Sequence, residues 1–443
     1  MWKTLLLSYL RRRMIPDRSA PPPISNIVPA DLPAHQEIIL DNGLKMYVLH
    51  FPDQPILKIE LAFHAGRPEE QQRLAAYMTP RLMQEGAGGH SASEIAEQLE
   101  YYGASMSAWN WLDACGFTLT GLSHYAEHTI PLFADMLLHP NFSEKELEVL
   151  IQNHLQELQV ELDKVEVISY RTLTERLYGA NHPLGYNSSA EDYRALNTAV
   201  LRQFYEKNLS LADAWIFVTG KVDDDIIALL RQYLGQHPAG KARSSDRHIP
   251  VPAPDFPKSG KYPRLNIEHP GALQASIKMG RLLFNRFHPD FYEVQVLNTI
   301  FGGYFGSRLM SDIREEKGFT YNIYSGIDTY YETGYLYVST EVNSDKAEAT
   351  IRAIRKAMKD LRENPVSDEE LSMVRNYMTG ALLNGLDGPL NKSSVLRSII
   401  FERIGQEGIA RQLDVLQHIT AGRLMELANQ YLQPKDFLTV VVR

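Results

Sequence analysis

The chain is almost free of cysteine, since Cys115 is the only one among 443 residues. A single thiol forms no disulfide framework, which suits a reducing compartment. It also excludes every zinc site that is built from several cysteines. Any metal held by this chain therefore needs histidine and carboxylate ligands.

Basic residues are scarcer than acidic ones. The chain has 45 Lys and Arg against 54 Asp and Glu, a net charge of -9 and a pI near 5.9. This balance argues against a nucleic-acid-binding surface. No apolar run is long enough to cross a bilayer. We therefore expect neither nucleic acid nor a membrane as a partner.

The first residues, MWKTLLLSYLRRRMIP, place their arginines after a short apolar piece. A secretory signal has the opposite order. We expect a cytoplasmic protein, although the absence of acids before Asp17 leaves a mitochondrial location open, and a periplasmic one is not excluded. Met14 offers a second possible start, so the true beginning of the chain stays open.

Composition divides the chain into four parts. A proline-rich N-terminal extension covers residues 1–35, and a stretch rich in Pro, Gly and Ser, residues 234–262, reads as a linker. Two α+β domains are expected between and after them, at 36–233 and 263–443.

The first domain opens with clear local signals. EIILDNGLKMYVLH holds two β-type runs around Asn42-Gly43, which predicts a hairpin. ILKIELAFHAG reads as the next strand. SASEIAEQLEYYG reads as a helix, with Ser91 and Glu94 at capping-box spacing and Gly103 as its stop.

The second half repeats the first. NFSEKELEVL matches NPVSDEELSMV with Ser143 opposite Ser367, a shift of 367 − 143 = 224. LRQFYEKNLSLADAWIFV matches LMELANQYLQPKDFLTVV with Leu201 opposite Leu424, a shift of 223. EIAEQLEYYGASMS matches RLMSDIREEKGFTY in the same order. We therefore predict two homologous α+β domains, each a mostly antiparallel sheet with helices packed on one face.

One motif has the letters of a zinc peptidase. His124, Glu127 and His128 spell H-x-x-E-H, in which two histidines hold zinc and the glutamate takes a proton from the bound water. A third ligand must come from elsewhere, and Glu206 is the nominee. This reading makes the chain a self-sufficient zinc peptidase.

The context of that motif argues for a polar turn instead. Pro131 has no N–H for the carbonyl of Glu127, so it disrupts a helix over the motif. The motif also follows a strand directly, which makes Thr129-Ile130-Pro131 the better helix start. We interpret the motif as a solvated turn before a core helix.

The duplicated α+β halves, the hairpin-strand-helix opening and the helix SEKELEVL together resemble the insulinase/pitrilysin-type metallopeptidase family, from about residue 36 onward. The resemblance implies a zinc motif on the first long helix, in LAAYMTPRLMQEG. The three ligand and base positions there hold Ala76, Thr79 and Pro80, and the distal carboxylate falls near Glu157. It implies no metal and no cofactor in this chain.

FGGYFGSRLMSDIREEKGFTYNIYSG (301–326) resembles a second signature of the family, an Arg and a Tyr seven residues apart. The matching residues are Arg314 and Tyr321, which would hold substrate backbone and hydrogen-bond the carbonyl oxygen as it becomes tetrahedral. The local pattern puts Arg314 in the last turn of a helix stopped by Gly318 and Tyr321 on the next strand. A guanidinium and a phenol are suitable donors for a developing oxyanion.

The overall pattern resembles the small bacterial two-subunit branch of the family. It implies a half-clamshell that faces a zinc-bearing subunit around a polar chamber, with peptides as substrates. The chain would then be the non-zinc subunit of a heterodimeric zinc endopeptidase, inactive alone. Two alternatives stay open: the self-sufficient zinc peptidase, and a non-catalytic structural member of the family. The peptide preferred, the partner's identity and self-association also stay open.

Overall fold

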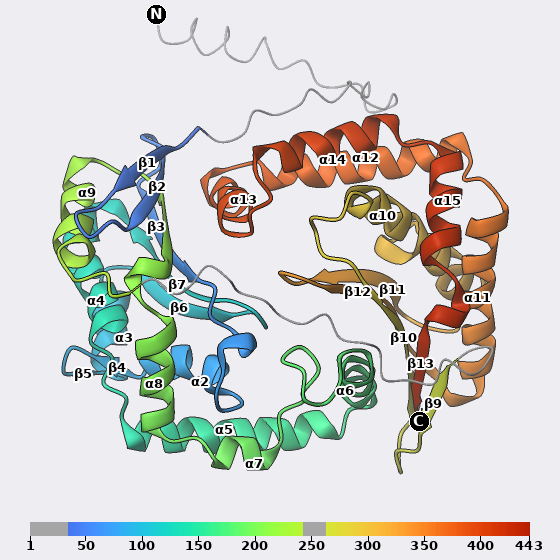
Figure 1. Ribbon diagram of the computed structural model, residues 1–443, viewed down its shortest axis with the longest axis horizontal. Coiled ribbons are helices and arrows are strands. Elements are labelled where there is room, and N and C mark those ends of the chain that lie inside the picture. The colour runs from blue at the N-terminus through green and yellow to red at the C-terminus, as the bar shows by residue number, and fades with distance from the viewer. Residues whose placement is uncertain (1–33, 242–262) are drawn as a thin grey trace, which may run out of the picture. The chain divides into compact units, whose positions relative to one another are not determined.

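The computed structural model describes residues 34–241 and 263–443 (Figure 1). The predicted N-terminal extension, except for its last two residues, and the predicted linker beyond residue 241 lie outside the described residues. Within the described ranges, no helix combines the length and apolarity that a bilayer span requires.

The first half contains a six-stranded sheet in the order β1-β2-β8-β3-β7-β6. Only the β2–β8 pair is parallel. The predicted hairpin at Asn42-Gly43 joins β1 to β2, with Gly43 at φ +85°. The strands are β1 (Gln36–Ile39), β2 (Lys45–His50), β3 (Ile56–Phe63), β6 (Ser105–Asn110), β7 (Cys115–Leu122) and β8 (Ala214–Gly220).

Helices from the first half cover one face of this sheet (Figure 1). The core between them contains Met78, Phe133 and Phe204 from the helices and Ile59 and Phe117 from the strands. The helices of this half are α2 (Ala75–Met83), α3 (Ala92–Tyr101), α4 (Ala126–Leu138), α5 (Glu144–Leu162), α6 (Val165–Tyr178), α7 (Ala190–Arg194), α8 (Thr198–Asn208) and α9 (Asp224–Leu230). Short elements are β4 (Gly86–Ala87), β5 (His90–Ser91), η1 (Arg67–Glu69), η2 (Ser123–Tyr125), η3 (Leu211–Asp213) and η4 (Arg231–Gly235).

The second half contains a five-stranded sheet in the order β11-β12-β10-β13-β9, in which only β13–β9 is parallel. Its strands are β9 (Arg264–Ile267), β10 (Gln274–Leu283), β11 (Ile323–Thr329), β12 (Gly334–Asn343) and β13 (Leu438–Val442). Its helices are α10 (Phe291–Asn298), α11 (Ala347–Glu363), α12 (Asp368–Gly385), α13 (Pro389–Phe401), α14 (Gln406–His418) and α15 (Ala421–Tyr431). The π-helical turns η5 (Thr299–Gly303) and η6 (Met310–Glu316) and the 3₁₀ turns η7 (Ser344–Lys346) and η8 (Pro434–Asp436) complete it.

The two sheets have the same topology. The run β2-β8-β3-β7-β6 and the run β9-β13-β10-β12-β11 agree strand by strand, including the single parallel pair. The matched serines also start equivalent helices, since Ser143 caps α5 and Ser367 caps α12 through the backbone N–H three residues on. The prediction of two homologous, mostly antiparallel α+β domains is confirmed.

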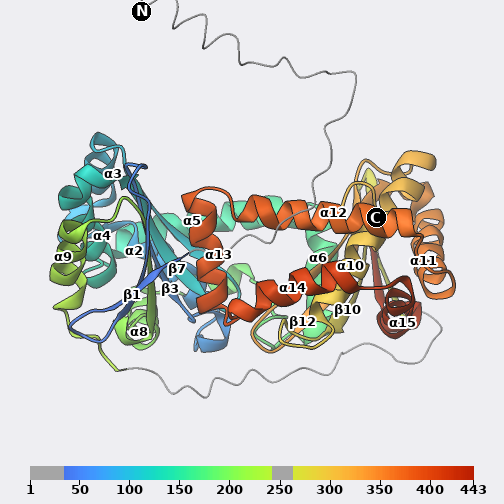
Figure 2. The same ribbon diagram turned by 90° about the horizontal axis from the view of Figure 1, so that it is seen from above.

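One helix from each half packs on the sheet of the other half. Helix α6 contacts β10 and β13, and α13 contacts β8 (Figures 1 and 2). Because strand residues alternate between faces, Ile216 faces the helices of its own half, while Phe217 belongs to the opposite cluster, which contains Phe401 at the end of α13. Trp215, on the same face as Phe217, meets the Phe401 ring at 5.4 Å between centroids. Both faces of β8 are therefore buried, which explains its nearly unbroken apolar sequence.

A glycine makes room for the contact of α6 with the second sheet. A Cβ added at Gly280 on β10 would lie 2.9 Å from Cδ2 of Leu173 on α6. The hydroxyls of Ser169 on α6 and Ser276 on β10 are 2.8 Å apart at the same junction. Residues of both α6 and β10 therefore allow the helix and the sheet to approach closely.

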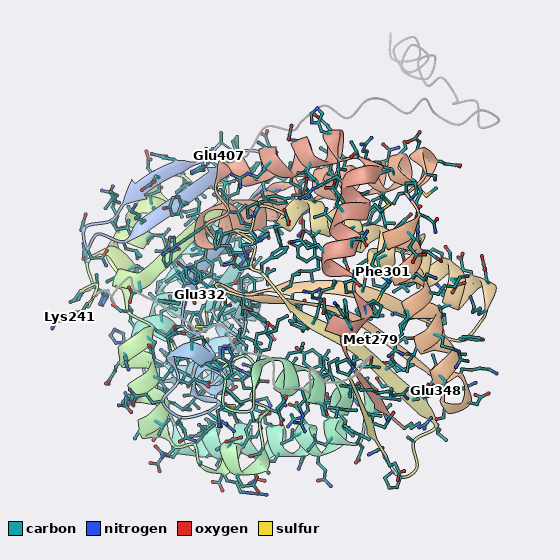
Figure 3. All side chains as sticks on the ribbon, turned by 45° about the vertical axis from the view of Figure 1, so that its right-hand side comes forward. Lys241, Met279, Phe301, Glu332, Glu348 and Glu407 are labelled. Atoms are coloured by element: carbon teal, nitrogen blue, oxygen red, sulfur yellow. The ribbon has the colours of Figure 1, made fainter. Side chains whose placement is uncertain are left out.

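The core of the second half lies between its sheet and its own helices. Figure 3 labels Met279 of β10 and Phe301 of η5, both fully buried members of this core. Both residues lie in runs that contain several other apolar residues, as expected of segments that are covered on more than one side.

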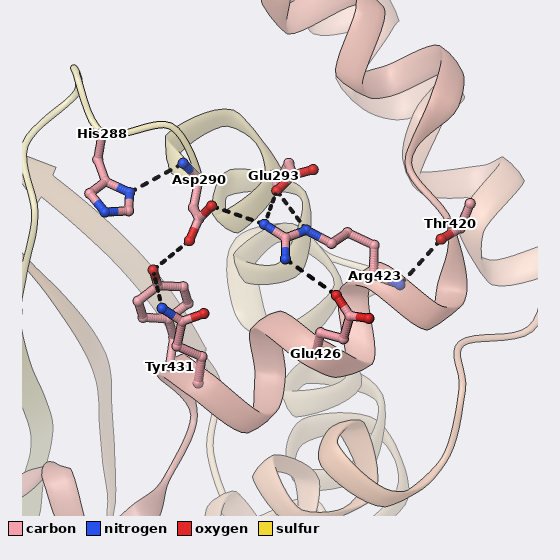
Figure 4. Close-up of polar contacts among 8 residues, drawn as sticks. His288, Asp290, Glu293, Thr420, Arg423, Glu426 and Tyr431 are labelled. Atoms are coloured by element: carbon pink, nitrogen blue, oxygen red, sulfur yellow. Dashed lines mark hydrogen bonds and ion pairs between the residues drawn. The ribbon is translucent and has the colours of Figure 1, made fainter.

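An ion-pair network joins α15 to α10 (Figure 4). Arg423 donates to Asp290 at 2.9 Å and to Glu293 at 2.7 Å, and it pairs with Glu426 at 3.3 Å. The Tyr431 hydroxyl donates to the other oxygen of Asp290 at 2.6 Å. Hydrogen bonding to Glu293 raises the pKa of Arg423, so this cation keeps its charge and anchors α15.

Candidate functional site

The H-x-x-E-H motif lies across a helix start. His124 is in η2, and Glu127 and His128 are in the first turn of α4. The His128 ring stacks on Tyr102 with centroids 4.4 Å apart, and its Nε2 lies 3.3 Å from Glu127. The His124 ring contacts Tyr125 instead, at 3.9 Å between centroids. The two histidines thus contact different aromatic partners.

The expected start of α4 at Thr129 is wrong, because the helix begins at Ala126. Pro131 therefore lies inside the helix and removes one backbone hydrogen bond without ending it. The helix persists because its apolar face, with Ile130 and Phe133 fully buried, gains more from packing than one hydrogen bond contributes. Thr129 also donates its hydroxyl to the carbonyl of Tyr125 at 3.2 Å.

In residues 34–241 and 263–443, no three side chains of His, Cys, Asp or Glu gather so that they could hold a metal ion. Glu206, the nominee for a third ligand, lies on α8 and lines a cavity of about 440 Å³ together with Tyr205 and Lys207. The geometry does not assemble the motif residues and Glu206 into one centre.

The position that the resemblance assigns to zinc is on α2. Ala76 and Thr79 are almost fully buried there, and Pro80 is buried inside the helix. The Thr79 hydroxyl donates to the carbonyl of Leu201 at 3.4 Å. A methyl group, a committed hydroxyl and a pyrrolidine ring offer no histidine or carboxylate ligand, so these residues do not fit a zinc ion.

A guanidinium lies next to this position. Pro80 cannot donate to the carbonyl of Ala76, and Nδ2 of Asn110 donates to that oxygen instead, at 2.9 Å. Arg81 donates to Oδ1 of Asn110 at 2.6 Å and to the carbonyl of Tyr77 at 2.7 Å, with its guanidinium 3.5 Å from the Tyr77 ring centroid. Asn110 therefore replaces the backbone donor that Pro80 lacks, and Arg81 fixes the position of Asn110.

Glu157, the predicted distal carboxylate, pairs with His154 at 2.8 Å on the exposed side of α5. The His154 ring lies between Tyr77 and Tyr193, at 5.4 and 5.8 Å between centroids. Burial lowers the pKa of Arg81, and the two tyrosines and Glu157 oppose that change. Arg81 is therefore close enough to Glu157 for their charges to interact, while His154 is the direct partner of Glu157.

The start of α2 is held by a partly buried carboxylate. Glu70 accepts from the N–H of Ala76 at 2.8 Å and from the Tyr186 hydroxyl at 2.6 Å. Burial raises the pKa of Glu70 to about 7, although both hydrogen bonds and Arg67 oppose the change. Leu74, the residue before α2, has φ +70°, so this helix begins from a strained backbone.

The structure brings Arg314 and Tyr321 together. Cζ of Arg314 lies 5.1 Å from the Tyr321 ring centroid. Arg314 is in the last turn of η6, and Gly318 follows at φ +62° with its N–H bonded to the carbonyl of Arg314, so the predicted helix stop is confirmed. The prediction that Tyr321 lies on a strand is wrong, because β11 begins at Ile323.

Thr320 explains why Tyr321 stays outside the sheet. Its hydroxyl accepts from the N–H of Asn322 at 3.2 Å and lies 2.7 Å from the carbonyl of Glu341 on β12. This side chain forms a local turn that competes with strand pairing. Tyr321 is consequently presented at the surface, with 86% of its area exposed.

Phe305 is a site residue that the sequence did not single out. Its ring centroid lies 4.6 Å from Cζ of Arg314, on a side chain that is 61% exposed. The guanidinium thus contacts two exposed rings, Phe305 and Tyr321. The sequence did contain a signal for this residue. Phe305 lies in the glycine-rich run GGYFG, and a short turn of this kind leaves an aromatic side chain exposed.

We call Arg314, Tyr321 and Phe305 the Arg314 cluster, and the side-chain donors of its two polar members are unused within the described residues. Within the described ranges, Arg314 has no carboxylate within ion-pair distance and the Tyr321 hydroxyl has no hydrogen-bond partner. A guanidinium stacked against rings keeps its N–H edges available. The cluster can therefore donate to a carbonyl or carboxylate oxygen from outside the chain.

Two family models match the chain. The model described as Insulinase (Peptidase family M16) matches residues 46–184, and the model described as Peptidase M16 inactive domain matches residues 195–378. Together they span well over half of the 443 residues.

Several known proteins are similar along most of their length. Uncharacterized zinc protease YmxG of Bacillus subtilis is 25% identical and covers 80% of this chain and 85% of its own. Uncharacterized zinc protease Rv2782c of Mycobacterium tuberculosis is 22% identical, over 91% and 92% of the two chains. Non-peptidase homolog YmxG of Helicobacter pylori is 25% identical, over 78% and 79%.

Solved structures share the fold. A peptidase M16 inactive domain from Pseudomonas fluorescens superposes with a TM-score of 0.81 at 23% identity, over 92% of this chain and 98% of that one. A protease from Helicobacter pylori superposes with a TM-score of 0.82 at 16% identity, over 93% and 100%.

Proposed function

Since the chain belongs to the insulinase family of peptidases, peptidase family M16, we propose that it is the non-zinc subunit of a heterodimeric zinc endopeptidase. In this proposal a partner subunit of the same family carries the zinc ion. This chain contributes peptide binding and oxyanion stabilisation through Arg314 and Tyr321.

The observation that carries the proposal is the free set of donors in the Arg314 cluster. A surface arginine usually pairs with an acid or is solvated, and a tyrosine usually buries its ring. Here the guanidinium is stacked on Phe305 and Tyr321, both exposed, without a carboxylate partner in the described residues. Such donors are suited to a peptide carbonyl whose oxygen becomes negative during hydrolysis.

The α2 region supports the division of labour. Ala76, Thr79 and Pro80 provide no ligand, and the Arg81 guanidinium supplies a positive charge near Glu157. A zinc ion in a partner would supply the activated water. The residues of this chain would hold the peptide and donate hydrogen bonds to it.

The inner face of the first sheet supports a peptide-containing chamber along its outer strands, β6 and β7. Register places Lys58 opposite Thr120, and Glu60 opposite Thr118, which itself pairs with Ser107. These side chains share one face, whereas the alternate residues belong to the apolar core. Glu60 is buried and pairs with Lys58 at 2.8 Å and with Arg397 of α13 at 3.1 Å. The accessible hydroxyls of Ser107, Thr118 and Thr120 on β6 and β7 are the part of this face that suits an extended peptide, which needs hydrogen-bond partners.

The test combines this chain with a zinc-bearing family member from the same organism and measures cleavage of a fluorogenic peptide. Tyr321→Phe is expected to lower kcat about 100-fold, as for loss of one oxyanion donor, with little change in KM. Tyr101→Phe is the matched control, since Tyr101 is an equally exposed tyrosine in the first half, at 81%. Full activity of Tyr321→Phe would contradict the proposed catalytic role.

A non-catalytic, structural role is the second candidate. One relative is named a non-peptidase homolog, and one matching model is described as an inactive domain. If wild type, Arg314→Lys and Tyr321→Phe all support the same cleavage rate in the mixture, the structural role is favoured.

The self-sufficient zinc peptidase is tested on the chain alone. The proposal expects no stoichiometric zinc after purification and no change in metal content on His128→Ala. One zinc per chain that is lost in His128→Ala would establish the H-x-x-E-H motif as a metal site and end the proposal.

A further inference from the structure

Asp328 lies on a sheet face that is otherwise rich in tyrosine. It is on β11, directly opposite Tyr335 of β12, and Gly326 is opposite Tyr337 on the same face. The Tyr335 hydroxyl donates to Oδ2 of Asp328 at 2.6 Å. A Cβ at Gly326 would lie 2.8 Å from the Tyr337 ring, so the glycine lets that ring lie across the strand.

The tyrosine rings come from both halves of the chain. Tyr335 stacks with Tyr337 at 5.3 Å and meets Tyr178 of α6 edge-on at 6.1 Å. The hydroxyl of Tyr170, also on α6, lies 3.4 Å from that of Tyr335. Tyr324 meets Tyr337 at 6.0 Å. Because α6 of the first half packs on the second sheet, it contributes two of the tyrosines that lie around Asp328.

Part of this surface is accessible. Tyr324 and Tyr170 are 41% and 39% exposed, and Asp328 and Tyr337 are partly buried. Tyr335, in contrast, is fully buried and serves to hold the carboxylate. The arrangement is a carboxylate fixed from behind by a phenol and flanked by rings that reach solvent.

The nearby cations are committed to other acids. Arg286 forms an ion pair with Glu402 and donates to the carbonyl of Thr329 at 3.3 Å. Lys278 donates to Ser339 at 2.5 Å and lies 3.7 Å from Glu341. Within the described ranges, Asp328 has no cationic partner of its own.

The surrounding phenols are neutral. Burial raises the pKa of Tyr178, Tyr330 and Tyr337, and the charge of Asp328 raises each of them further. The carboxylate therefore faces aromatic rings and hydroxyls that do not neutralise it. A partly buried anion in such surroundings is stabilised by a cation that can also contact ring faces.

We propose that Asp328, with Tyr337 and Tyr170 near it and Tyr324 beyond Tyr337 on the same face, is a subsite for a basic side chain of a bound peptide. The inference rests on the proposed peptide-binding function and adds a preference for lysine or arginine. The ammonium or guanidinium group would pair with the free oxygen of Asp328 while its methylene stem lies along the tyrosine rings.

A protein-bound metal ion suits this site less well than an organic cation. One carboxylate with neutral phenols supplies too few oxygen ligands for Ca²⁺ or Mg²⁺, which take six or more including water. An organic cation instead gains from ring faces, which contribute to its binding even when partly exposed. The chemistry thus favours a side-chain cation.

The test measures binding of two blocked tripeptides to the full chain by isothermal titration calorimetry. One is acetyl-Gly-Lys-Gly-amide and the other contains norleucine in place of lysine, so the ammonium group is the difference. We expect wild type to bind the lysine peptide about tenfold more tightly, from one ion pair and ring contacts. Asp328→Asn keeps the acceptor for Tyr335 but is expected to remove that preference.

Two further variants make the assignment specific. Tyr324→Leu is expected to reduce the preference in part, since it removes one ring but no charge. Asp345→Asn removes an exposed acid of the same half, which pairs with Lys346, and is expected to bind as wild type does.

Equal binding of both peptides by wild type would overturn the inference, whether or not any variant folds. A preference that survives in Asp328→Asn would overturn the assignment to Asp328. Arg314→Lys should leave the lysine preference intact, so a failure of the catalytic proposal and a failure of this subsite give different results.

Discussion

Glu70 makes the stability of the first half depend on pH in a defined direction. Burial raises the pKa of Glu70 from 4.5 to about 7 in the folded chain. Between these two pH values the folded state binds more protons than the unfolded state. The stabilising contribution of protonated Glu70 is therefore complete below pH 4.5 and is lost as the pH rises through 7.

The size of the effect follows from the shift. A difference of about 2.5 pKa units corresponds to about 3 kcal/mol of unfolding free energy. Glu70→Gln is uncharged at every pH, and its amide can still accept from the N–H of Ala76. The free energy of unfolding of Glu70→Gln, minus that of wild type, is expected to rise by up to about 3 kcal/mol between pH 4 and pH 8.

Urea denaturation of both proteins across that pH range measures the difference directly, since other titrating groups are common to both. Glu97→Gln, which makes the same substitution at an exposed position of α3, is the control for the change of side chain itself. A flat or falling difference for Glu70→Gln would refute the argument that burial outweighs the two hydrogen bonds of this carboxylate.

Two further predictions concern the helices. Leu173→Ala removes a fully buried side chain between α6 and the second sheet, and urea denaturation is expected to show that the free energy of unfolding falls by about 2–5 kcal/mol. The control, Leu390→Ala at an exposed position, is expected to change it little, and an equally small effect of Leu173→Ala would mean that packing of α6 on the second sheet contributes little to stability. Asn110→Ala leaves the carbonyl of Ala76 without its donor and is expected to lower the free energy of unfolding by about 1–3 kcal/mol. The loss should be smaller in a Pro80→Ala background, where residue 80 supplies a backbone N–H, so a double-mutant cycle that shows simple additivity would contradict this account.

The sequence by itself determined the repeated α+β plan. Ser143 and Ser367 mark equivalent helix starts because capping chemistry is local, and Gly43 and Gly318 mark a hairpin and a helix stop because only a few residue types tolerate positive φ. The sequence also predicted that Arg314 lies in the last helical turn before Gly318, because the end of a helix is a local feature.

Local patterns were misleading where packing outweighed them. Pro131 predicted a later start for α4, but the buried face of the helix offsets one missing hydrogen bond. Tyr321 looked like a strand residue, but the Thr320 hydroxyl and its bonds to β12 keep it at the surface.

The tertiary structure alone decided which surfaces meet. Apolar periodicity shows that a strand such as β13 is covered on both faces, but it does not say that one cover, α6, comes from the other half of the chain. The contact of Phe305 with Arg314 and the ring of tyrosines around Asp328 depend on that long-range packing. No local pattern encodes them, because the residues involved are brought together only when the two sheets and the exchanged helices are in place.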